Sequence, residues 1–70
     1  MRLSRHARNE MRLYRTGTQD VEGALANPAR RDFDDLGNAR LSGATADGRP
    51  ILVVVAQDDP DLVITVFLRR

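Results

Sequence analysis

The sequence predicts an α+β fold in which two N-terminal helices pack on an antiparallel sheet of three to four strands, in the order ααββββ. Two observations lead to this prediction. Apolar residues recur with a helical period up to about residue 27, and from residue 29 onward they alternate or run continuously, as in strands. Turn dipeptides, above all Asp47-Gly48, divide the second half into segments of strand length.

The first helix is predicted over residues 5 to 15. Ser4 can cap its N-terminus, and the segment contains no Gly or Pro. Ala7, Met11 and Tyr14 form an apolar stripe at helical spacing, and Glu10 extends that half of the helix. The opposite side carries Arg5, Arg8, Arg12 and Arg15.

A second helix is predicted from a cap at Thr18 to the Asn27-Pro28 dipeptide. Val21, Ala24 and Leu25 supply its apolar face, and acidic residues lie in its first turn. Neither helix is long enough to be stable alone, so both must pack on another element.

Four strands and their turns follow. The predicted strands are 29–35, 40–46, 51–56 and 62–68, with turns at 36–38, 47–48 and 58–61. The first strand is polar on both faces, which is typical of an edge strand. The run 51–56 is apolar on both faces, as expected of an inner strand.

Length and composition limit the alternatives. A chain of 70 residues has room for one core, so we expect one domain over residues 1–70. A core this small leaves much surface uncovered, so a homodimer or a complex with another protein is an alternative to a monomer. No cysteine, metal motif or cofactor fingerprint is present, so we expect neither a metal nor a cofactor. No apolar run could form a signal peptide or cross a membrane, which favours a cytoplasmic protein.

The arginine side of the first helix is the candidate nucleic-acid surface. Arg5, Arg8, Arg12 and Arg15 have the spacing of cations that follow a phosphate backbone. The alternative is an ordinary solvated helix face. All eleven basic residues are arginine, which suits phosphate contacts but also follows from a GC-rich genome.

Three residues are candidates for chemistry. His6 is the one side chain whose ordinary pKa lies near neutrality, so it is the candidate acid–base group. Arg40 and Arg49 could stabilise a phosphorane in metal-independent RNA cleavage. A hydrogen bond between helix and sheet is the structural alternative for His6, and cross-strand pairing is the alternative for the arginines. Thr65 could donate to a phosphate oxygen, but threonine is also common in strands.

Several short motifs resemble a family of small bacterial domains related to the BrnT and RelE/ParE-like toxins. The motifs are Ser4-Arg5-His6-Ala7-Arg8, Met11-Arg12-Leu13-Tyr14, Asp20-Val21, Asn27-Pro28, Gly43 to Val55 and Val63-Ile64-Thr65-Val66-Phe67. The resemblance implies a RelE-like helical hairpin packed on an antiparallel sheet. RelE-like members are ribonucleases that cut mRNA and are silenced by a bound antitoxin, whereas ParE-like members act on DNA gyrase. Glu10 departs from the resemblance, which implies a basic residue there.

Two functions therefore remain open. The first is a toxin-like domain of a type II toxin–antitoxin system that binds RNA or cleaves mRNA, with an antitoxin and RNA or the ribosome as partners. The second is a non-catalytic module that binds a protein through its edge strand or its helices.

Overall fold

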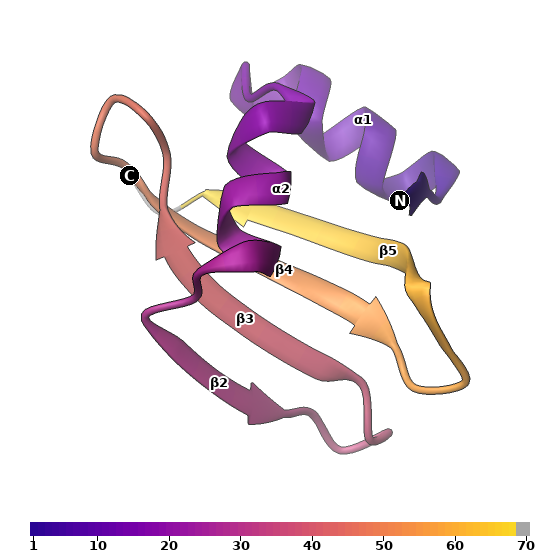
Figure 1. The fold of residues 1–70 in the computed structure, drawn as a ribbon. Helices are drawn as coiled ribbons and strands as arrows, with labels where there is room; N and C mark the ends of the chain where they lie inside the picture. The colour runs from indigo at the N-terminus through magenta and orange to yellow at the C-terminus, as the bar shows by residue number, and fades with distance from the viewer. Residues whose placement is uncertain (69–70) are drawn as a thin grey trace.

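The computed structural model describes residues 1–68, which form two helices and five strands (Figure 1). In chain order the elements are β1 (Arg2–Leu3), α1 (Arg5–Tyr14), α2 (Thr18–Ala26), β2 (Arg30–Phe33), β3 (Ala39–Ala44), β4 (Pro50–Ala56) and β5 (Asp59–Leu68). Both predicted helices and all four predicted strand segments are present, and β1 is additional.

The sheet corrects the predicted fold class. It has five strands in the order β1-β5-β4-β3-β2, and it is mixed because β1 pairs with β5 in parallel. The prediction of a wholly antiparallel sheet of three to four strands was wrong. A strand of two residues, Arg2 and Leu3, is too short to carry a periodic pattern, and it exists only because β5 supplies Leu62 and Val63 as partners.

Ser4 joins the start of α1 to the sheet. Its hydroxyl oxygen accepts a hydrogen bond from the Ala7 N–H at 3.0 Å, as an N-cap does, and the hydroxyl donates to the Ile64 carbonyl of β5 at 3.1 Å. The helix ends at Arg15, whose backbone is left-handed with φ 54°. The predicted cap is confirmed, and the same side chain also fixes α1 to β5.

The start of α2 differs from the prediction. Its N-cap is Gly17, which makes no side-chain cap bond, and Thr18 is the first helical residue. Asp20 in the first turn instead accepts hydrogen bonds from the Thr16 hydroxyl and from the Ala46 N–H in the β3–β4 loop, each at 2.9 Å. The helix is therefore anchored by a carboxylate that binds two other segments of the chain.

The strand order confirms two element-level predictions and corrects a third. β2 is the outer strand on its side of the sheet, and β4 is an inner strand between β3 and β5. The turn predicted at 58–61 is shorter, because β5 already begins at Asp59. The β4–β5 register shifts around Val55, so an irregularity in pairing accompanies this early start.

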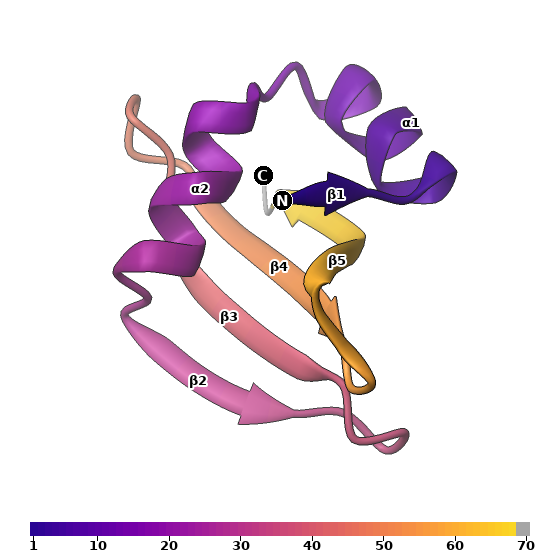
Figure 2. The same cartoon turned by 45° about the vertical axis from the view of Figure 1, so that its right-hand side comes forward.

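The two helices lie on one side of the sheet and leave the other side open (Figure 2). α2 packs on β3 and β4, and α1 packs on β5. The buried core between the layers comprises Ala7, Met11, Val21, Ala24, Leu41, Ile51, Val53, Val55, Val63, Val66 and Leu68. Residues that alternate with these along the strands point to the open side.

Candidate nucleic-acid interface

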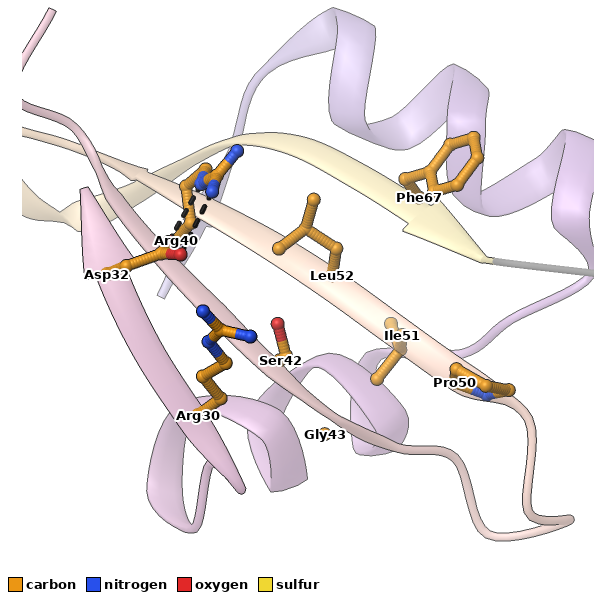
Figure 3. Close-up of a pocket in the computed structure, with 9 residues that line it drawn as sticks. All are labelled: Arg30, Asp32, Arg40, Ser42, Gly43, Pro50, Ile51, Leu52 and Phe67. Carbon is orange, nitrogen blue, oxygen red and sulfur yellow. Dashed lines mark hydrogen bonds and ion pairs between the residues drawn. The ribbon is translucent and has the colours of Figure 1, made fainter. Parts of the chain in front are cut away.

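A shallow groove of about 430 Å³ lies on the open face of the sheet (Figure 3). It crosses four neighbouring strands, because the register places Arg30 of β2 beside Ser42 of β3, then Leu52 of β4 and Phe67 of β5. All four side chains point to the same side of the sheet in Figure 3. The groove therefore combines a cation, a hydroxyl and an apolar, partly aromatic floor.

One ion pair closes one end of this groove. The Arg40 guanidinium donates two parallel hydrogen bonds to the Asp32 carboxylate, at 2.8 and 2.9 Å. These bonds lower the pKa of Asp32 and raise that of Arg40, so both stay charged. Among the described residues that line the groove, Asp32 is the only carboxylate, and Arg40 neutralises it.

Arg30 is the uncompensated charge in the groove. Its side chain is exposed and makes no ion pair within residues 1–68. The groove consequently carries a net positive charge beside an apolar surface.

Phe67 connects the groove to α1. The residue is 45% exposed, and its ring and the Tyr14 ring of α1 meet edge to face, with centroids 5.6 Å apart and planes at 77°. Phe67 is thus in contact with α1 and still partly open to solvent.

The arginines predicted to bind nucleic acid lie on the exposed side of α1. All four, Arg5, Arg8, Arg12 and Arg15, are exposed, and none forms an ion pair with another described residue. They share α1 with Tyr14, but they lie on the side of the helix opposite to the apolar stripe that packs on the sheet. The row and the groove are therefore separate surfaces.

His6 contacts Glu10 rather than any of the arginine candidates. Its Nε2 lies 3.1 Å from the Glu10 Oε1, and the same oxygen accepts the Val66 N–H of β5 at 2.9 Å. His6 is 67% exposed at its side chain, while Glu10 is 16% exposed. Glu10 thus has a structural role, which accounts for an acid where the resemblance implies a base.

Arg49 binds the end of α1. It donates to the Tyr14 carbonyl at 2.9 Å and to the Arg15 carbonyl at 3.4 Å, and it pairs with Asp47. A cation at the C-terminus of a helix satisfies carbonyls that have no partner within the helix.

The three candidates for chemistry lie at three separate places. His6 is in the first turn of α1 and Arg49 is at its last carbonyls, about 13 Å apart along a helix that rises 1.5 Å per residue. Arg40 lies in the groove on the open face of the sheet. Thr65 is next to Val54 on that face, opposite Arg40 across β4. Only Arg40 and Thr65 share a surface.

Sequence reasoning missed the groove itself. Arg30, Ser42 and Phe67 come from three different strands, and no local motif joins them. Only the register of the four strands β2, β3, β4 and β5 brings them into one row. Knowledge of that register would have been needed to predict the groove. No group of three or more His, Cys, Asp or Glu residues that could hold a metal ion occurs in the described part of the chain.

Comparison with known proteins assigns the family. Residues 3–68 match the profile of a domain of unknown function, DUF4258. The chain belongs to this family. No curated protein and no solved structure matches the DUF4258 chain.

Within residues 1–68, neither helix is long and apolar enough to cross a membrane.

Proposed function

We propose that this DUF4258 domain binds single-stranded RNA on its open sheet face and acts as a toxin-like domain of a type II toxin–antitoxin system. One observation supports this most: Asp32, the only carboxylate among the described residues of the groove, is neutralised by Arg40, while Arg30 makes no ion pair and lies in the same cross-strand row as the partly exposed Phe67. A free cation and a partly exposed aromatic ring on one sheet face are the two elements that bind a phosphate and an unpaired base.

The proposed path of the strand follows the row of side chains across the groove. A base stacks on Phe67 at one side, and a phosphate contacts Arg30 at the other. The arginines of α1 lie on a separate surface and add to the electrostatic attraction of the RNA. A paired duplex would not offer its bases to the ring, so single strands are preferred.

The proposed activity is RNA binding, and RNA cleavage is not part of the proposal. His6, Arg40 and Arg49 have different partners and different locations, so they do not form one acid–base and phosphate centre. A toxin of this kind would stop growth by occupying mRNA or ribosomal RNA, and an antitoxin protein would prevent that binding.

The test is fluorescence anisotropy with labelled 12-nucleotide oligo(U) and oligo(A) at low salt. Arg30→Glu should weaken binding about tenfold or more, and Phe67→Ala should weaken it by about 1–3 kcal/mol per stacked base. Arg31→Glu is the matched control, because it makes the same charge change on the next residue of β2, which faces the other side of the sheet. It should change the affinity less than about threefold.

Two further measurements connect binding to the cell. The Arg5→Gln, Arg8→Gln, Arg12→Gln triple variant should lower the salt dependence of binding, because fewer counterions are released. Induced expression of the wild type should arrest growth, and Arg30→Glu should not. Equal losses for Arg30→Glu and Arg31→Glu, or no RNA binding by the wild type at low salt, would refute the proposal.

A further inference from the structure

The side of the sheet that carries the helices has a second hollow, which we call the helix-side groove. It measures about 770 Å³ and lies between the C-terminal end of α2 and the turns at the far end of the sheet. Its apolar lining includes Leu25, Pro28, Phe33, Leu41, Val55 and Pro60. Its floor, Leu41 and Val55, is buried, whereas Arg31 and Phe33 of β2 at its border are exposed.

Large apolar side chains are exposed at this corner of the molecule. Phe33 at the end of β2 is 63% exposed, and Leu36 in the following turn is 78% exposed. Of these two residues, Phe33 lines the helix-side groove, so the groove has an exposed aromatic side chain at its border.

The described lining of the helix-side groove carries positive charge and no negative charge. None of its twelve lining residues is Asp or Glu, and Arg31 is the one cation among them. Arg31 is exposed and makes no ion pair in the described chain. An occupant that fits this lining carries apolar side chains and a carboxylate.

The border of the helix-side groove also suggests the shape of the occupant. Arg31 and Phe33 belong to β2, which has β3 as its one strand neighbour among residues 1–68. A free strand edge can pair with an extended segment, whose alternate side chains then point to one face of the sheet. Here that face is the helix-side groove.

We propose that the helix-side groove binds an extended peptide of a protein partner, added along β2, with large apolar side chains and a carboxylate that pairs with Arg31. This inference is independent of the proposed RNA binding, because RNA and peptide would occupy opposite faces of the sheet.

Selection from a random library of 12-residue peptides displayed on phage tests this directly. Peptides that bind the wild type should be enriched in Leu, Ile or Phe together with Asp or Glu. In titrations with the synthetic peptides, Arg31→Glu and Phe33→Ala should each weaken binding about tenfold, a loss of about 1.4 kcal/mol. Both residues are exposed, so these variants should fold, and circular dichroism checks this.

Arg30→Glu is the matched control in this experiment and should bind the selected peptides within about threefold of the wild type. Replacing each Asp or Glu of a peptide by Asn or Gln should weaken binding to the wild type but not to Arg31→Glu. Failure to enrich any peptide, enrichment of basic peptides, or equal affinity for wild type and Arg31→Glu would overturn the proposal.

Discussion

Glu10 shows how much one side chain can do at the boundary between layers. Its Oε1 accepts the Val66 N–H at 2.9 Å, although a strand N–H ordinarily pairs with another strand. The short β1 does not reach Val66, because it pairs only with Leu62 and Val63. A helix side chain thus takes the place of a missing strand partner at this edge of the sheet.

Glu10→Ala should lower the free energy of unfolding by about 1–3 kcal/mol, because it leaves the Val66 N–H without a partner in a half-buried place. Urea denaturation measures this, and hydrogen exchange should show faster exchange of the Val66 amide. Glu10→Gln keeps an acceptor and should cost less. His6→Ala removes only the exposed partner of Glu10 and should change stability by less than about 0.5 kcal/mol. A His6→Ala loss as large as that of Glu10→Ala would contradict this account.

At the scale of elements, α2 is held to the β3–β4 loop by one carboxylate. Asp20 accepts from the Ala46 N–H and the Thr16 hydroxyl, and these bonds, the Ala46 bond first, lower its pKa below the ordinary 3.8. The folded state therefore binds this proton less readily than the unfolded chain does. The stabilisation is complete above the unfolded pKa and is lost as pH falls through the folded pKa.

Asp20→Asn should accordingly reduce stability at pH 6, by about 1 kcal/mol. The difference from wild type should shrink as pH falls below about 4, because the wild-type carboxylate becomes protonated there. Chemical denaturation at a series of pH values from 6 to 3 measures this. Three other aspartates, Asp32, Asp34 and Asp47, also have a lowered pKa. Because the wild type and the variant both contain them, their effect on stability cancels in the difference between the two proteins. A difference that does not change with pH would show that the charge of Asp20 is unimportant.

The elements also show what could be predicted from the sequence. Ser4, the apolar stripe of α1 and the Asp47-Gly48 turn act through local backbone preferences, so the helix and the β3–β4 hairpin were found from neighbouring residues. β1 was missed because two residues carry no period. The cap of α2 was placed at Thr18, one residue too late, because threonine has a side chain that can cap, whereas Gly17 occupies the cap position without a side-chain bond.

The candidate site was less predictable than the fold for the same reason. The exposed row of arginines on α1 follows a helical repeat and could be predicted, although its binding role stays a prediction. Arg30 and Phe67 lie 37 positions apart, on β2 and β5, and share one cross-strand row only through the strand register. Arg49 was proposed for chemistry, and its contact with the Tyr14 carbonyl depends on where the β3–β4 loop lies in space. Local patterns do not contain that information.

For the whole molecule, the sheet separates two surfaces of different chemistry. The open face carries Arg30, with a neutralised Asp32 and an exposed Phe67, and the helix-side groove carries Arg31 among apolar residues. Adjacent residues of β2 thus serve opposite faces because strand side chains alternate.

The two surfaces should therefore bind their ligands together. Saturation with a peptide selected on the helix-side groove should change the affinity for oligo(U) by less than about threefold, since the charges lie on opposite faces and salt screens them. Anisotropy titrations of labelled RNA with and without peptide measure this. Competition of tenfold or more would mean that the two ligands share a surface.

The contact between α1 and β5 also sets the order in which the chain can fold. Ser4 bonds to Ile64 and Glu10 bonds to Val66, across 60 and 56 positions of the chain. A ribosome makes α1 early, and a helix of this length does not persist in water by itself. α1 must wait for β5 to leave the exit tunnel before it can dock. The nascent chain therefore stays open to proteases and chaperones until β5 has been made and has left the ribosome.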